Sequence, residues 1–450
     1  MQKRAVMCFG PAFHFSSFLL LLLLLVVVVE MKRCPDDCLC DFEEKIADCS
    51  DRFLRQPPDN LDPTFTKLIF RNNYLGDLTS EYFRNEHLTH LKELDLSKNY
   101  IRKIYSDAFY GLDALFHLNI QSNEISYLVE DSFNDLVSLE YLLLDNNTLQ
   151  YLYEDTFHDL GKLKKLGLSE NKLEYVEPGT FKGMHNLTNL DMSDNSIRTL
   201  SPGFLDGIEG TLEILLLDNN KILTIEDGAF KNMSSLWLLS LGNNRLKKIR
   251  GSGFEGLVAL EYLYISGNIL DEITPDTFQH LPKLKSLDLS HNVIYSIYSD
   301  AFSANSNLQQ LYLSRNSWLY IYSEFSFIDV PSLEVLKLSG NKVRHLSVNI
   351  FQNTPNLTTL ALDYTYLSKI DIEALHHLKK LKYLSIHDNP LPCDCSLHKI
   401  RLWCIENNVD TSWFTIDMGY LSSEMHLEPS CIFPEEEIAM TWDKLKCNKE

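Results

Sequence analysis

The sequence has no cysteine over the 343 residues between Cys49 and Cys393, although the whole chain has ten. Four cysteines lie within Cys34–Cys49 and five within the last fifty-eight residues. This absence confines any disulfides to the two ends of the chain. Disulfide-linked ends made in an oxidising compartment are one interpretation, and zinc binding by four cysteines is the alternative.

The sequence also lacks an excess of basic residues, with 41 Lys and Arg against 62 Asp and Glu and a net charge of −21. Duplex DNA and anionic membrane surfaces bind through basic patches, so this balance argues against both as partners. The apolar fraction of 45% is ordinary for a folded protein and excludes a disordered or collagen-like chain.

Long apolar runs are absent except near the N-terminus. Phe18–Val29 has no polar residue and follows Lys3 and Arg4, which is typical of a signal peptide. These twelve residues fall short of the ~20 that a membrane helix needs. We predict that residues 1–30 are a signal peptide, with an uncleaved anchor as the alternative. Either interpretation places the bulk of the chain outside the cytosol, secreted or anchored at the cell surface.

One pattern, Leu-x-x-Leu-x-Leu-x-x-Asn-x-Ile/Leu, recurs fourteen times at intervals of 24 to 26 residues. The alternating leucines predict a short strand with one apolar face. A single repeat cannot bury that face, so neighbouring repeats must stack into a parallel sheet. We number the repeats 1 to 14 by the Asn position, which Thr365 occupies in repeat 13; the positions are 73, 99, 123, 147, 171, 195, 220, 244, 268, 292, 316, 341, 365 and 389.

A Phe follows most of these Asn positions by about ten residues, and stacked Phe side chains would fill the convex half of the core. An Asp precedes several of them by two residues. Capping of a short helical turn on the convex side is one interpretation of the Asp residues, and an ion site is the other. The Phe residues are Phe109, Phe133, Phe157, Phe181, Phe230, Phe254, Phe278, Phe302 and Phe351, with Phe204 and Phe327 shifted by one and Leu375 as a substitute; the Asp residues are Asp107, Asp131, Asp155, Asp276 and Asp300.

Across residues 65–391 the chain resembles the leucine-rich repeat family, in its 24-residue extracellular subtype. The resemblance implies an α/β fold: a curved right-handed solenoid with a parallel concave β-sheet and disulfide-bonded caps at both ends. In this family the Asn side chain bonds the backbone of adjacent coils, so Thr365 predicts one weaker position. The 450 residues then form one elongated unit rather than three domains: signal peptide 1–30, N-terminal cap 31–60, repeats 61–389 and C-terminal cap 390–450.

The cysteine segments resemble the family's two caps. Sequence alone allows three pairings for every four cysteines. The resemblance implies Cys34–Cys40, Cys38–Cys49, Cys393–Cys431 and Cys395–Cys447. Cys404 is then left over, beside Trp403 on an apolar helix face; a buried inert thiol and an interchain bridge are the two interpretations.

Motifs of enzymes are absent or coincidental. Gly251-x-Gly253-x-x-Gly256 matches a dinucleotide fingerprint, but Phe254 within it is the repeat's own core Phe, and the required strand-to-helix context is missing. The sequence has no nucleophile elbow, phosphate loop or HExxH motif. We therefore predict no enzyme activity, no cofactor and no metal site. Four sequons predict exposed glycosylation sites at Asn146, Asn186, Asn232 and Asn356.

The concave face carries the candidate binding site, because residues beside the paired leucines point to solvent. Repeats 7 to 9 bring apolar residues together on adjacent strands: Ile214, Leu216, Trp237, Leu238, Tyr262 and Tyr264, with Tyr312 as an extension. Tyr and Trp dominate protein–protein hot spots. The alternative to a binding site is that these residues pack sideways against one another on neighbouring strands. We call the segment that follows each Asn the ascending flank. There Tyr127, Tyr151 and Tyr175 form a second stack, which serves either packing or binding.

We therefore predict a recognition protein that binds a protein ligand on this face, with Asp191, Asp288 and Lys337 as a polar rim. The alternative is a structural matrix or adhesion component. The C-terminal cap with Cys393-x-Cys395 favours the recognition protein over this alternative. It resembles the caps of variable lymphocyte receptors, Toll-type and Slit-type ectodomains and platelet-glycoprotein-like receptors. The ligand and the oligomeric state stay open.

Overall fold

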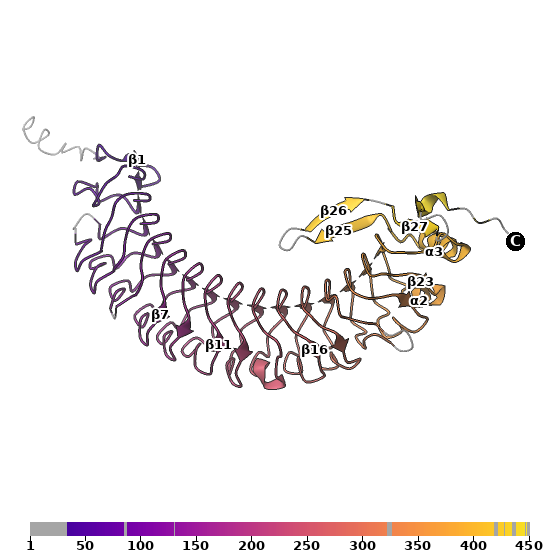
Figure 1. The fold of residues 1–450 in the computed structure, drawn as a ribbon. Helices are drawn as coiled ribbons and strands as arrows, with labels where there is room; N and C mark the ends of the chain where they lie inside the picture. The colour runs from indigo at the N-terminus through magenta and orange to yellow at the C-terminus, as the bar shows by residue number, and fades with distance from the viewer. Residues whose placement is uncertain are drawn as a thin grey trace, which may run out of the picture.

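The computed structural model describes residues 34–84, 88–129, 131–321, 326–417, 422–426, 428–433, 438–445 and 447. They form one curved stack of coils, with the sheet along the inner side of the arc and a cap at each end (Figure 1). The predicted signal peptide, residues 1–30, lies outside the described residues. Within them, no helix is long and apolar enough to cross a membrane.

One sheet of sixteen strands lines the concave side in chain order. The pair β1–β2 is antiparallel, and every later pair is parallel. From β3 onward the middle residue of each strand is a buried Leu, as the leucine alternation predicts. The strands are β1 (Leu39–Asp41), β2 (Ile46–Asp48), β3 (Lys67–Ile69), β4 (Glu93–Asp95), β5 (His117–Asn119), β6 (Tyr141–Leu143), β8 (Lys165–Gly167), β10 (Asn189–Asp191), β12 (Ile214–Leu216), β14 (Leu238–Ser240), β15 (Tyr262–Tyr264), β17 (Ser286–Asp288), β19 (Gln310–Tyr312), β20 (Val335–Lys337), β22 (Thr359–Ala361) and β24 (Tyr383–Ser385).

A ladder of buried Asn side chains joins each coil to its neighbour. Asn220 Nδ2 donates to Met192 O of the preceding repeat at 2.9 Å and to Leu217 O of its own repeat at 3.1 Å. Its Oδ1 accepts from Ile197 N at 3.0 Å. The Asn residues of repeats 1 to 11 and 14 make equivalent bonds. These side chains satisfy backbone groups that the tight turns leave unpaired.

The ladder is interrupted near Thr365, as the sequence predicts. Thr365 Oγ1 donates to Leu362 O of its own repeat at 2.8 Å and to Asn389 Oδ1 at 3.1 Å. Val343 N donates to the backbone oxygen of Thr365 rather than to a side chain. One repeat earlier, the buried Oδ1 of Asn341 has no hydrogen-bond partner among the described residues. The weak region therefore extends over repeats 12 and 13.

Stacked Phe rings fill the convex half of the core. From Phe83 to Phe181 successive ring centroids lie 5.7–6.4 Å apart in stacked pairs. The shifted Phe204 is still buried but meets Phe230 edge-on, and stacking resumes from Phe230 to Phe302. Phe254 is fully buried in this stack. The fingerprint-like glycines around it therefore belong to a convex turn and to no nucleotide site.

The expected helical turns on the convex side are mostly absent from the described residues. The helical segments there are η1 (Gly251–Phe254) and α2 (Ile372–His376). The capping interpretation is wrong for Asp107, Asp131 and Asp155, whose φ angles are 58°, 61° and 59°. A residue that caps a helix start has extended backbone, whereas these residues occupy left-handed turns. Short flank strands pair instead: β7 (Tyr151–Leu152) with β9 (Tyr175–Val176), β11 (Thr199–Leu200) with β13 (Thr224–Ile225), β16 (Glu272–Ile273) with β18 (Ser296–Ile297), and β21 (His345–Leu346) with β23 (Lys369–Ile370).

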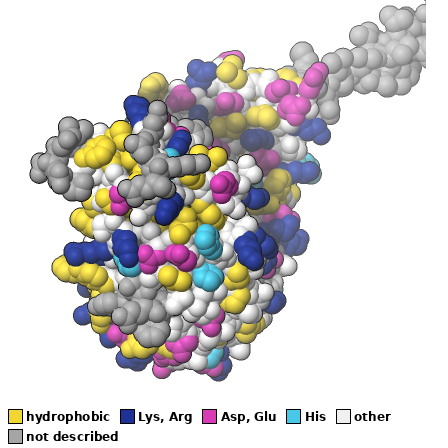
Figure 2. Space-filling view, turned by 90° about the vertical axis from the view of Figure 1, so that its right-hand side faces the viewer, with side chains coloured by type: hydrophobic (Ala, Val, Ile, Leu, Met, Phe, Trp, Pro, Cys, Tyr) yellow, Lys and Arg dark blue, Asp and Glu magenta, His cyan; other side chains and the backbone are white. Residues whose placement is uncertain are grey.

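Disulfides link the cysteines of both caps. The four pairs, Cys34–Cys40, Cys38–Cys49, Cys393–Cys431 and Cys395–Cys447, are those that the resemblance implies. The C-terminal cap contains α3 (Cys395–Glu406), β25 (Trp413–Asp417), β26 (Ser422–His426), β27 (Ser430–Phe433), β28 (Ile438–Thr441) and η2 (Trp442–Lys444). The Asp394 carboxylate accepts from Leu397 N at 2.9 Å and so begins α3. At this end of the arc, basic and acidic side chains are interspersed (Figure 2).

Cys404 is a free, buried thiol on the face of α3 that includes Leu397 and Ile400. Burial raises the pKa of this thiol to about 12. At pH 8 only about one molecule in ten thousand would carry the reactive thiolate. We expect iodoacetamide at pH 8 to leave Cys404 unmodified in the folded chain and to alkylate it after unfolding without reductant, as measured by peptide mass spectrometry. Rapid alkylation in the folded chain would contradict this assignment.

Candidate functional site: the concave face

The predicted concave residues lie in two parallel rows on neighbouring strands. Strand pairing places Ile214 beside Leu238 and Leu238 beside Tyr262 in the first row. Trp237 lies next to this row, with its ring centroid 5.8 Å from that of Tyr262 in an edge-to-face arrangement. Such pairs contribute about 0.5–1.5 kcal/mol beyond the area they bury. The first row is therefore one continuous apolar surface.

The second row is divided. Ser240 separates Leu216 from Tyr264, and Ser240 is buried rather than directed to solvent. Its Oγ donates to Asp218 Oδ1 at 2.6 Å, and Gly242 N donates to the same oxygen at 2.9 Å. Burial raises the pKa of the Asp218 carboxyl despite these two donors. The structure thus separates Leu216 from the aromatic residues that the sequence groups with it.

Tyr264 and Tyr312 lie on either side of Asp288 in the second row. Burial, with a contribution from the Asp288 charge, raises the pKa of both phenols. Tyr312 Oη donates to Gln310 Oε1 at 3.1 Å, and Lys337 Nζ lies 5.4 Å from the centroid of the Tyr312 ring. Both phenols therefore stay neutral hydrogen-bond groups at physiological pH.

All seven predicted ligand-binding residues are half-buried, and none belongs to the exposed class. Sideways packing therefore accounts for part of their grouping, as the alternative interpretation holds. What remains open to solvent is the outer part of each ring, held in place by its neighbours.

Strands β8, β14 and β24 each end in a small residue, namely Gly167, Ser240 and Ser385. In each case a carboxylate from the turn after the preceding strand occupies the space beside it. An added Cβ at Gly167 would overlap the Asp145 carboxylate oxygens, and Asp218 accepts a hydrogen bond from Ser240 Oγ. Asp363 accepts from Ser385 Oγ in the same way. Residues beside the paired leucines were predicted to point to solvent, whereas Gly167 and Ser385, which occupy such positions, are both buried.

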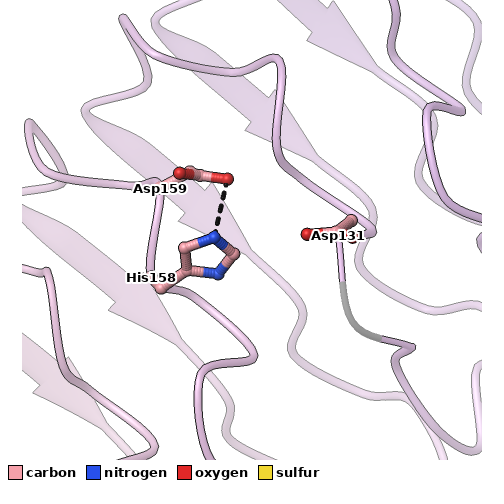
Figure 3. Close-up of side chains that lie close together, drawn as sticks. All are labelled: Asp131, His158 and Asp159. Carbon is pink, nitrogen blue, oxygen red and sulfur yellow. Dashed lines mark ion pairs between the residues drawn. The ribbon is translucent and has the colours of Figure 1, made fainter.

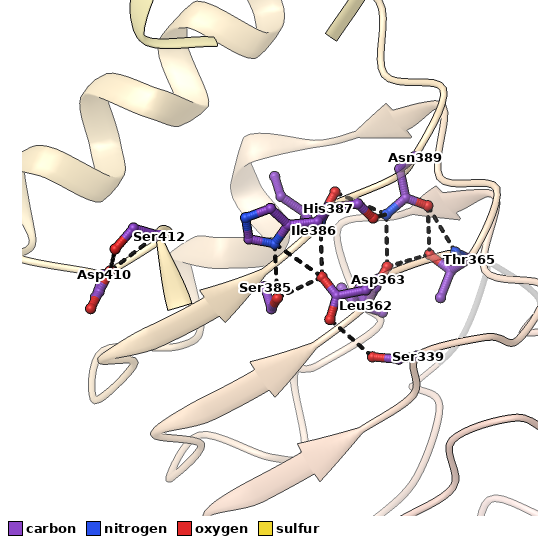
Figure 4. A network of polar contacts seen from close by, with 10 residues as sticks. All are labelled: Ser339, Leu362, Asp363, Thr365, Ser385, Ile386, His387, Asn389, Asp410 and Ser412. Atoms are coloured by element: carbon purple, nitrogen blue, oxygen red, sulfur yellow. Dashed lines mark hydrogen bonds and ion pairs between the residues drawn. The ribbon is translucent and has the colours of Figure 1, made fainter. Parts of the chain in front are cut away.

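Ser385, His387 and Asp363 gather in one buried network (Figure 4). Ser385 Oγ and Asp363 Oδ1 lie 3.1 and 3.2 Å from the same imidazole nitrogen, Nδ1. In a catalytic triad the Ser and the Asp contact opposite nitrogens. Asp363 also accepts from Ser339 Oγ at 3.2 Å, so the network ties repeats 12, 13 and 14 together. Its geometry is that of a structural bridge.

Asp131, His158 and Asp159 bring carboxylates and an imidazole together on the convex side (Figure 3). His158 Nε2 lies 3.1 Å from Asp159 Oδ2, and Nδ1 lies 2.9 Å from Asp155 O. The hydrogen bond to the Asp155 carbonyl contributes most to raising the pKa of His158. Both ring nitrogens thus have oxygen partners, which suits a protonated imidazole. Asp159 is exposed, and its contact with His158 is a surface ion pair.

The predicted glycosylation residues divide unequally between the two flanks. Asn146 is exposed and follows strand β6, and its Nδ2 donates to Ser122 Oγ at 3.1 Å. Asn186, Asn232 and Asn356 precede the strands of their repeats; the first two are exposed and the third is half-buried. Their modification stays a prediction.

The most exposed aromatic residues lie away from the concave group, and the sequence pattern predicted only Tyr127, Tyr151 and Tyr175 among those of the ascending flank. Trp318 is 61% exposed on the ascending flank of repeat 11. In other repeats the residue two positions after the Asn is buried. In this repeat that residue is Trp318, and Leu319 is buried in its place, so the extra residue of the repeat leaves Trp318 facing outward. The 25-residue interval after Asn316 was the available signal. Other exposed aromatic residues of this flank include Tyr74, Tyr100, Tyr105, Tyr127, Tyr151, Tyr153, Tyr175, Tyr295, Tyr298, Tyr320 and Tyr366.

Comparison with known proteins agrees with the repeat architecture described above. The profile described as "Leucine rich repeat" matches residues 63–125, 119–173, 162–211, 210–270, 266–317 and 331–391, together more than half of the chain. The chain belongs to the leucine-rich repeat family. A curated relative, the U2 small nuclear ribonucleoprotein A' of Aspergillus fumigatus, is 36% identical over 62 residues, which are 14% of this chain and 24% of that protein.

Solved structures of other leucine-rich repeat proteins share the fold. TLR13 in its complex with ssRNA13 has a TM-score of 0.69 at 23% identity, over 80% of this chain and 60% of that chain. Toll in the Drosophila Toll–Spatzle complex has a TM-score of 0.59 at 23% identity, over 76% and 53%. The internalin InlF of Listeria monocytogenes has a TM-score of 0.53 at 21% identity, over 71% and 86%. The chain thus spans less than two thirds of the TLR13 and Toll structures, and these identities establish the fold alone.

Proposed function

We propose that this chain is a secreted or cell-surface recognition protein that binds a protein ligand on its concave face. The edge-to-face pair of Trp237 and Tyr262, continuous with Leu238 and Ile214, is the observation that carries the proposal. Rings already held by their neighbours lose little conformational entropy when a ligand covers them. Aromatic anchors of this kind supply most of the free energy at many protein interfaces.

Charged residues adjoin the apolar rows and would determine specificity. Asp191 pairs in register with Leu216, Asp288 lies between the two tyrosines of the second row, and Lys337 lies over Tyr312. A partner that presents a cation opposite Asp191 and Asp288 would be favoured over one with acidic groups there.

Location outside the cytosol is supported by chemistry at both ends of the chain. Four disulfides require an oxidising compartment for their formation. The predicted signal peptide and the sequons agree with export. The complexes of Toll with Spatzle and of TLR13 with ssRNA13 show that proteins of this fold bind macromolecules of different classes.

The double substitution Trp237→Ala and Tyr262→Ala tests the concave site. We expect it to weaken ligand binding by about 2 kcal/mol or more, roughly thirtyfold, because it removes both aromatic anchors. The partner would first be captured from conditioned medium with the intact chain and identified by mass spectrometry. Its affinity for both proteins would then be measured by calorimetry.

The pair Tyr151→Ala and Tyr175→Ala is the matched control, since both residues are exposed tyrosines on the ascending flank. An equal loss with this pair would show that the effect is not specific to the concave face, and a loss with this pair alone would move the binding site to that flank. Circular dichroism of both variants must match that of the parent chain. Unchanged capture of collagen by the concave variant would instead favour the structural matrix alternative.

A further inference from the structure

The ascending flank of repeat 8 carries a dense group of cations in an otherwise acidic chain. Arg245, Lys247, Lys248 and Arg250 are all exposed. None of the four side chains has a hydrogen-bond or ion-pair partner among the described residues. Lysines elsewhere pair with the neighbouring repeat, as Lys285 does with Glu261 at 2.7 Å. The chain therefore leaves four positive charges unneutralised within six residues.

A shallow hollow with aromatic walls begins at this cation group. Lys247 lines it together with Asp271, Val293, Tyr295, Trp318 and Tyr320. Trp318, Tyr295 and Tyr320 are 61%, 52% and 42% exposed. Beyond the hollow, Lys342 Nζ lies 4.7 Å from the Trp318 ring centroid and 5.1 Å from that of Tyr320. Cations thus lie at both ends of the aromatic surface.

One carboxylate residue, Asp271, also lines the hollow. The Oδ1 atom of Asp271 is buried and has no hydrogen-bond partner among the described residues. An acidic peptide offers carboxylates to the cations, but Asp and Glu side chains have no broad apolar face to lie on the rings. A sugar offers hydroxyl donors, and its apolar C–H face can lie on Trp or Tyr.

We propose that this surface binds an acidic polysaccharide, with sugar rings on the aromatic walls and sulfate or carboxylate groups on the cations. The surface runs from repeat 8 to repeat 12, about 19 Å at ~4.8 Å per strand, which suits a linear chain rather than a single sugar. None of the sequons lies on this part of the ascending flank. The site is distinct from the concave face and does not depend on a ligand there.

The net charge of −21 does not preclude a polyanion. At physiological ionic strength charges are screened over about 8 Å, so the local cations dominate the potential that a ligand senses on this flank. Clusters of Lys and Arg of this length are typical of heparin-binding patches. The overall acidity is expected to slow approach rather than to prevent binding.

Heparin, neutral dextran and polyglutamate distinguish the possible ligands when each is titrated into the full chain. We expect heparin to bind with an affinity that falls as salt rises, because binding displaces counterions. Dextran and polyglutamate should bind at least about tenfold more weakly, because each supplies only half of the required chemistry. Polyglutamate binding as tight as that of heparin would overturn the polysaccharide assignment.

Two sets of substitutions locate the site. Lys247→Ala with Lys248→Ala should lower heparin affinity about tenfold or more and reduce its salt dependence. Trp318→Ala should lower affinity about fivefold with the salt dependence unchanged, since it removes stacking alone. The control is Lys379→Ala with Lys380→Ala, another exposed lysine pair, which precedes strand β24.

The control pair should leave heparin affinity within about twofold of the parent chain. An equal loss with both lysine pairs would show diffuse attraction and overturn the proposal. An unchanged affinity for Trp318→Ala would remove the hollow from the site. The concave variant Trp237→Ala with Tyr262→Ala should bind heparin normally, so failure of either proposal can be recognised separately.

Discussion

Replacing Asn220 with alanine is expected to lower the free energy of unfolding by about 3–5 kcal/mol. The change removes the donors to Met192 O and Leu217 O and the acceptor of Ile197 N. Each of these backbone groups belongs to a buried residue and would lose its partner, so each would keep its desolvation cost. Urea unfolding of the disulfide-intact chain measures the loss. Hydrogen exchange should show faster exchange of the Ile197 amide.

Thr365→Ala is the matched control within the same ladder. Its hydroxyl donates only to Leu362 O and Asn389 Oδ1, and Asn389 Oδ1 keeps two backbone donors. A loss of about 1 kcal/mol is expected, within the range for a single hydrogen bond. Equal losses for the two substitutions would mean that the turns hold their conformation without the amide ladder.

Replacing Gly183 with alanine is expected to cost about 3–5 kcal/mol, the sum of backbone strain and overlap. Its φ of +88° is a conformation that L side chains rarely adopt. An added Cβ would also overlap the carbonyl oxygen of His158 in the preceding repeat. Backbone cannot move aside without separating two coils, so the overlap is relieved only by loss of coil-to-coil packing. The midpoint of thermal unfolding measures this effect.

Gly228→Ala separates the two contributions. Gly228 has a similar φ of +83°, but no atom lies within 4 Å of an added Cβ. Only the backbone strain then remains, about 1–2 kcal/mol. If Gly183→Ala and Gly228→Ala shift the unfolding midpoint equally, close approach of the coils contributes nothing at Gly183.

The repeat pattern was readable from the sequence because it depends on local periodicity alone. Alternating leucines such as Leu94 and Leu96 can bury one face only by stacking, and the structure has them buried throughout. The turns on the convex side were not predictable in the same way. Asp is a residue type that often caps helices, but Asp107 occupies a left-handed turn. The conformation of each turn depends on how the neighbouring coils pack.

The candidate binding surfaces were predicted only in part. Leucine spacing correctly placed Tyr262 and Trp237 on neighbouring strands. It did not show that Ser240 turns under Asp218 and divides the second row, because that depends on a hydrogen bond between repeats. The outward position of Trp318 likewise follows from one extra residue in a turn rather than from any feature of the Trp itself.

The sequence by itself determined the solenoid, its fourteen repeats and the position of the weak ladder member at Thr365. These features follow from a short period that each repeat carries independently. Only the tertiary structure decided which side chains meet between repeats. It placed Lys247, Asp271 and Trp318 in the lining of one hollow and left an Asp271 oxygen without a donor among the described residues, although 24 to 71 residues of chain separate these groups from one another. Contacts between coils depend on side-chain length and turn conformation, which the periodic pattern does not specify.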